Sequence, residues 1–158
     1  MSDVKKEYEK YQKKHNLPSY DELDKEFELL YIGDIKEIKF TLRFVRRRIN
    51  DKISAACNML QSLLQPNPSS FINLQESSFF SKEEKMAYSA LLRDLMQIER
   101  VSLVLDFSSD DKKEAEFIKG VYKKWLEWKE EILKITKKLV EGWKNLEIKE
   151  EKKEQYFS

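Results

Sequence analysis

Four of the six arginines lie within six residues of one another, and two lysines precede them in the same segment; the six residues are Lys36, Lys39, Arg43, Arg46, Arg47 and Arg48. A guanidinium group presents a planar fork of donors that pairs with phosphate or carboxylate oxygens. Residues 35–53 carry seven basic and two acidic side chains, whereas residues 16–34 carry one basic and six acidic side chains. The chemistry that this pattern favours is therefore the binding of an anion.

Two phenylalanines, Phe40 and Phe44, are four residues apart and fall beside the basic face of the expected helix. Aromatic rings next to arginines suit nucleic acid, because rings stack on unpaired bases while guanidinium groups hold phosphates. The alternative is internal: the acidic residues of segment 21–28 neutralise the arginines, and the two rings pack under that segment. A protein partner with an acidic surface is a third interpretation. The sequence leaves all three open.

The connection over residues 65–80 is unusually apolar for a loop, since it contains Phe71, Ile72, Phe79 and Phe80. Apolar side chains in a connection either cover the end of a helical bundle or form an exposed patch that binds a partner. We name these four residues as a candidate docking loop, and the sequence does not decide between the two uses.

Residues suited to catalysis are scarce. His15 and Cys57 are the only histidine and the only cysteine, so they cannot supply a zinc site or a disulfide. The three glycines are scattered, which excludes a glycine-rich phosphate loop. We therefore predict a non-catalytic protein without cofactor or metal, with a carboxylate-bound metal enzyme as a remote alternative.

The elements that position these residues are helices. Apolar residues recur every three to four positions over about 34–64, 82–107 and 111–146. Only Lys52 interrupts the first of these stripes. The last stripe keeps a 3.5-residue period from Ile118 to Leu146, and we expect its Trp125 and Trp128 to lie in the core. The pattern predicts an all-α fold, an elongated antiparallel three-helix bundle with one or two shorter N-terminal helices packed on it. We expect one domain, with a mobile segment at 1–15 and a charged tail at 147–158. The helix over 82–107 is apolar around much of its circumference and is expected to be the most buried.

The function that these features favour is that of an adaptor or assembly subunit that binds another protein. The alternative is a nucleic-acid-binding accessory factor that binds RNA or DNA through the basic helix. The absence of a long apolar run and of an apolar N-terminal segment predicts a soluble cytoplasmic protein that does not enter a membrane. The sequence does not predict the oligomeric state.

Overall fold

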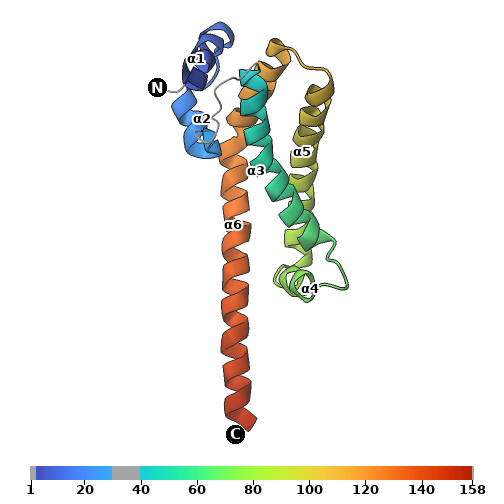
Figure 1. Cartoon of the computed structure of the whole chain (residues 1–158). Helices are drawn as coiled ribbons and strands as arrows, with labels where there is room; N and C mark the ends of the chain where they lie inside the picture. Colours follow the sequence, from blue (N-terminus) through green and yellow to red (C-terminus); the bar gives the residue numbers. More distant parts are fainter. Residues whose placement is uncertain (1–2, 30–39, 158) are drawn as a thin grey trace. The chain divides into compact units, whose positions relative to one another are not determined.

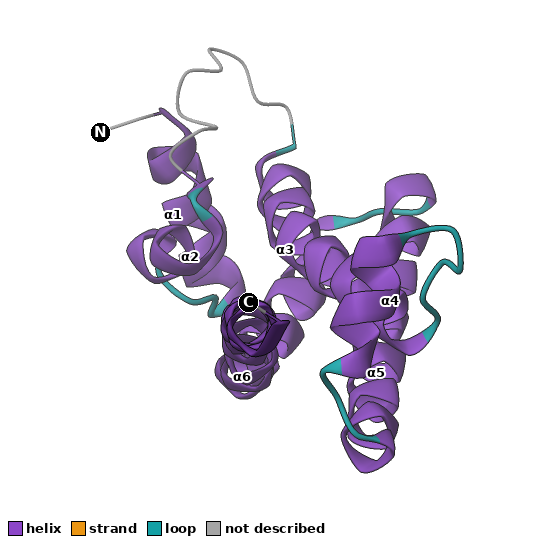
Figure 2. Cartoon of the chain, turned by 90° about the horizontal axis from the view of Figure 1, so that it is seen from below, coloured by secondary structure: helices purple, strands orange, loops and turns teal. Residues whose placement is uncertain are grey.

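The protein is all-α, as predicted. The computed structural model describes residues 3–29 and 40–157, with side chains for 4–29 and 40–146, and every regular element in this part of the chain is a helix (Figure 1, Figure 2). The six helices are α1 (Asp3–His15), α2 (Tyr20–Phe27), α3 (Thr41–Leu64), α4 (Phe71–Ser78), α5 (Lys82–Phe107) and α6 (Asp111–Phe157). Successive long helices run in opposite directions, which gives the antiparallel bundle arrangement (Figure 1).

Several helix ends follow from local side chains. Ser19 caps α2, and the side chain of Glu22 returns a hydrogen bond to the Ser19 backbone, which completes a capping box. Ser81 and Glu84 form the same pair at the start of α5. α3 ends at Leu64, two residues before Pro66. A further helical turn would require a backbone N–H donor, which proline lacks.

Two predicted boundaries need correction. The first long helix was expected from residue 34, but Phe40 is not helical and α3 begins at Thr41; residues 34–39 lie outside the described residues. The connection 65–80 was expected to have no regular structure, yet it contains α4, whose N-cap is Ser70. The Ser70 side chain accepts a hydrogen bond from the Asn73 backbone, so the capping signal was present without the acidic residue of a full capping box.

The chain divides into two compact units, and each is described by itself. The first comprises residues 1–57 and 93–126, so it holds α1, α2, most of α3, the C-terminal part of α5 and the N-terminal third of α6. Trp125 of α6 is buried, as predicted; its ring centroid lies 4.9 Å from that of Phe27, and its indole nitrogen donates to Glu26 at 2.8 Å. Tyr8 fixes α1 against α2 by donating to the Pro18 carbonyl at 2.7 Å.

The second unit comprises residues 58–92 and 127–158. Trp128, predicted as a core residue, is buried here. The ring of Phe79 meets Trp143 edge-on at 5.7 Å, and the Trp143 indole donates to Glu76 at 3.2 Å, so α4 is attached to α6. Ser77 donates to the Leu63 carbonyl at 2.8 Å, which attaches α4 to the end of α3 as well.

The buried stripes differ from the prediction in two places. In α3, Ile53 is buried where Lys52 had been assigned to the stripe, so the stripe has no lysine in it. In α5, only one face is buried, and Val101, Leu103, Val104 and Phe107 are exposed. The expectation that α5 is the most buried helix was wrong. It assumed that apolar residues around the whole circumference of a helix mean that the helix is buried on every side.

Candidate functional site

Arg46 is the most deeply buried member of the arginine cluster. Its side chain is 0% exposed and lies in the core of the first unit. Its Nε donates to Glu114 of α6 at 2.6 Å, one terminal nitrogen donates to Asp106 of α5 at 2.7 Å, and the other donates to the carbonyl and hydroxyl oxygens of Ser102. The guanidinium group is thus enclosed by acceptors from two neighbouring helices, which is what a buried cation requires.

The sequence pattern placed Arg46 on a basic face away from the apolar stripe of this helix, whereas its side chain lies in the core. Arg46 follows Leu42 by four residues and precedes Ile49 by three, so it lies on the apolar stripe of α3. The position of Arg46 on this stripe favours burial, whereas the charge of its side chain favours exposure to solvent. The acceptors Ser102 and Glu114 are 56 and 68 residues away in the sequence, and no local pattern connects them to α3.

Arg47 and Arg48 also have partners within the chain. Arg47 is half exposed and donates to Asp106 at 3.2 Å. Burial alone raises the pKa of Asp106, but the hydrogen bonds and charges of Arg46 and Arg47 outweigh it and hold that pKa below its usual value. Arg48 donates to Asp51 at 3.1 Å and to the Glu28 carbonyl at 3.3 Å.

The acidic segment 21–28 has other roles than the one predicted for it. Asp21 accepts from Lys5 of α1 at 2.8 Å, Glu22 caps its own helix, and Glu26 accepts from Trp125. The carboxylates that hold Arg46 and Arg47 come instead from α5 and α6. Arg46 and Arg47 are thus paired within the chain, and the carboxylates that pair with them, Asp106 and Glu114, lie outside segment 21–28.

A small aromatic and basic patch remains at the start of α3. Phe40 is 60% exposed, and the guanidinium carbon of Arg43 lies 5.2 Å from the centre of its ring, within the range of a cation–π contact. Phe44 is half-buried. Lys36 and Lys39 lie outside the described residues. The patch therefore contains Phe40, Arg43 and the exposed part of Arg47.

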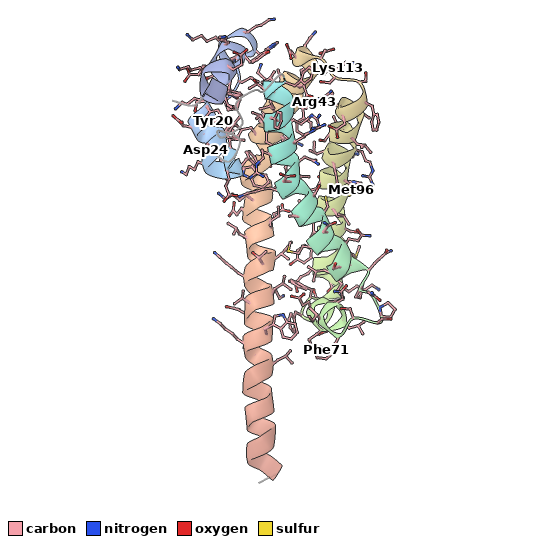
Figure 3. The ribbon with its side chains drawn as sticks, viewed as in Figure 1. Tyr20, Asp24, Arg43, Phe71, Met96 and Lys113 are labelled. Atoms are coloured by element: carbon pink, nitrogen blue, oxygen red, sulfur yellow. The ribbon has the colours of Figure 1, made fainter. Side chains whose placement is uncertain are left out.

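The four residues of the candidate docking loop differ in exposure. Phe80 is buried, and Phe79 packs on Trp143, so these two residues cover the end of the second unit. Phe71 and Ile72 are 71% and 57% exposed, and Leu74 is nearly half exposed. Figure 3 labels Phe71 on α4. We call Phe71, Ile72 and Leu74 the α4 surface.

The sequence around the α4 surface is nearly free of charge. Between Lys52 and Lys82, Glu76 is the only charged residue, although 37% of the chain is charged. Glu76 itself accepts the hydrogen bond of Trp143. This depletion was visible in the sequence and was the signal that marked α4 as different from the surrounding surface.

Cys57, the one cysteine of the chain, is buried. Burial and the nearby charge of Glu99 raise the pKa of Cys57 to about 12, which keeps the thiol protonated and a poor nucleophile. Across the described part of the chain, no group of three or more His, Cys, Asp or Glu side chains is placed to hold a metal ion. None of the helices described combines the length and apolar character that crossing a bilayer requires.

Comparison with protein-family models, with curated proteins and with solved structures found no match to this chain. The functional interpretation therefore depends on the surfaces described above.

Proposed function

We propose that this protein is a non-catalytic adaptor or assembly subunit that binds a protein partner through the α4 surface. The observation that carries the proposal is the combination of exposed Phe71 and Ile72 with a surrounding sequence in which Glu76 is the one charged residue between Lys52 and Lys82. The cores of protein interfaces are depleted of charged residues and enriched in aromatic ones. A large aromatic side chain that protrudes from a surface is also the usual form of a binding hot spot.

The apolar composition of the α4 surface determines the kind of partner surface that fits it. A charge brought against this surface loses its water and meets no counter-charge, which is unfavourable. The partner surface is therefore apolar and uncharged, with a recess for the Phe71 ring. Because the attraction is hydrophobic, the affinity depends only weakly on salt.

The proposed location is the cytoplasm, because a chain with a single cysteine cannot form the internal disulfide bonds that an oxidising compartment favours.

A photo-crosslinking amino acid at position 71 tests this proposal in cells. We expect one dominant crosslinked protein, absent when the crosslinker stands at the exposed Lys134 of α6. The purified partner is then titrated against the wild type and a Phe71→Ser/Ile72→Ser/Leu74→Ser variant. Loss of a hot spot weakens binding by at least about tenfold.

The matched control is Leu133→Ser/Val140→Ser, which removes two apolar side chains of α6 in the same unit that are 45% and 54% exposed. Equal loss of affinity in both variants, or crosslinking no stronger at position 71 than at 134, contradicts the proposal. Affinity that falls steeply with salt contradicts an uncharged interface.

The second candidate function is nucleic-acid binding, favoured by the exposed Phe40 ring with Arg43 against it. Its test is fluorescence anisotropy with labelled single-stranded RNA and duplex DNA over a salt series. The informative variant is Phe40→Ala/Arg47→Glu, because both side chains are largely exposed. Arg46 is left intact, since replacing it disturbs the core. Binding that is salt-dependent and lost in this variant favours nucleic acid over a protein partner.

A further inference from the structure

The first unit contains an apolar groove between α5 and α6. It has a volume of about 430 Å³ and is lined by Val101, Val104 and Leu105 of α5 and by Phe117, Gly120 and Val121 of α6. Leu105, Phe117 and Val121 are buried and form its floor, whereas Val104 is 62% exposed on its wall. We call these six residues the α5–α6 groove.

Gly120 lies in the lining of the groove on the exposed side of α6. A Cβ atom built at this position meets no other atom within 4 Å, so the space beside the α6 backbone is empty. Glycine in the middle of a helix costs stability relative to alanine, and no neighbouring element approaches closely enough to require it. The vacant space is of the kind that admits a side chain from another helix.

Lysines outnumber acidic residues along the α6 side of the groove. Lys113 lines one end, where its ammonium group lies 3.9 Å from the Asp110 carboxylate. Lys124 lies one helical turn beyond Gly120, past the other end of the lining, with Lys123 next to it in the sequence, and all three lysines are exposed. Glu116 is the one acidic residue in the lining. Figure 3 shows Lys113 close to the turn that joins α5 to α6. Lys113 and Lys124 are eleven residues apart, which corresponds to about 16 Å along a helix.

We propose that the α5–α6 groove binds an amphipathic helix of a partner protein whose apolar side enters the groove and whose acidic side chains meet the lysines. An apolar channel of this kind takes a helix with apolar residues at i, i+3 or i+4, and i+7. The lysine spacing places the acidic residues of that helix about three turns apart. This site is separate from the α4 surface and does not depend on it.

The test uses the full chain and two labelled peptides that share one apolar face. One peptide carries glutamates beside that face, and the other carries lysines at the same positions. We expect the glutamate peptide to bind at least about tenfold more tightly at low salt, with the difference shrinking in 1 M salt, because the charge contacts are screened.

Two variants locate the binding. Gly120→Leu places a large side chain in the groove, and we expect it to lower the affinity for the glutamate peptide by at least about tenfold. Gly120→Ala should leave that affinity within about threefold of the wild-type value. Both variants should fold, because the new side chain enters empty space. Lys124→Glu should reverse the preference between the peptides, and its control Lys119→Glu, at an exposed position outside the groove lining, should not.

Equal binding of the two peptides, or unchanged affinity in a folded Gly120→Leu variant, overturns the proposal. So does a dimer of the free chain, detected by sedimentation, that Gly120→Leu dissolves, because the occupant is then a second copy. The triple serine variant of the α4 surface should bind the peptide normally. That result separates failure of this site from failure of the α4 surface.

Discussion

Arg46 and Arg47 are neighbours on α3 and donate to the same carboxylate, Asp106, yet they differ in burial. A buried ion pair is expensive to break, because the partner left behind is a charge without water or counter-charge. A half-exposed pair is worth about 0–1 kcal/mol, since water competes for both groups. The two arginines therefore allow the same interaction to be compared at two depths.

We predict that Arg46→Met lowers the free energy of unfolding by about 3–5 kcal/mol, because it leaves the buried Glu114 without its partner. Arg47→Met should lower it by less than about 1 kcal/mol. Urea denaturation followed by circular dichroism measures both values. Adding Glu114→Gln to Arg46→Met should recover part of the loss, since the unpaired charge is then gone. Equal effects of the two arginine variants would show that burial does not control this network.

For buried charged residues such as Arg46, the sequence predicts the type of group that they bind better than it predicts where they lie in the fold. The anion-binding character of the arginines was predicted, and three of the four arginines hold carboxylates or backbone carbonyls within the chain. What could not be predicted is that the anions come from α5 and α6, because Asp106 and Glu114 meet Arg46 only after the helices have packed. Burial of a charge depends on the whole set of acceptors around it, and a single segment does not contain that information.

Within α6, two glycines stand in opposite environments. Gly120 borders empty space, whereas a Cβ at Gly142 would lie 2.3 Å from the Phe79 ring. We predict that Gly120→Ala raises the free energy of unfolding by about 0.5–1 kcal/mol through helix propensity. Gly142→Ala should lower it by about 1–3 kcal/mol, because the ring must move off Trp143. Thermal and urea denaturation of the two variants measure both effects. Stabilisation by Gly142→Ala would mean that Phe79 is free to move.

The start of α5 contains an acid-sensitive pair. Glu84 accepts from Lys138 of α6 at 2.6 Å and from the Ser81 backbone at 3.1 Å, and these contacts lower its pKa from 4.5 to about 2. A carboxylate with a lowered pKa in the folded state contributes stability above its unfolded pKa. That contribution is lost as the pH falls through the folded value. The pair therefore weakens between about pH 4.5 and pH 2.

We predict that Glu84→Gln lowers the free energy of unfolding by about 0.5–1 kcal/mol at pH 7, because the amide cannot pair with Lys138 as an ion. Near pH 2 about half of the Glu84 carboxylates in the folded wild type are protonated and most of the contribution is lost, so the difference should become small. Urea midpoints of both proteins at the two pH values test this. A difference that persists at pH 2 would assign the effect to the capping box rather than to the ion pair.

Helix ends were predictable where one residue decides them, and unpredictable where packing does. The capping boxes at Ser19 and Ser81 place the starts of α2 and α5, and Pro66 places the end of α3. The eight residues of α4 are too few to show a helical period, and contacts of Ser77 and Phe79 with α3 and α6 hold them. The exposure of its Phe71 therefore followed only from the folded structure.

Net charge and exposed apolar area together determine how the free chain behaves in solution. The net charge is +1 at pH 7 and the isoelectric point is about 7.7, so repulsion between copies is weak near neutral pH. The α4 surface is then free to associate with other copies when no partner covers it. We predict a solubility minimum near pH 7.7, measured by static light scattering, that is shallower in the Phe71→Ser/Ile72→Ser/Leu74→Ser variant. Leu133→Ser/Val140→Ser is the control for apolar area alone. If the two variants scatter light equally, the α4 surface is not the main surface through which the free protein associates with itself.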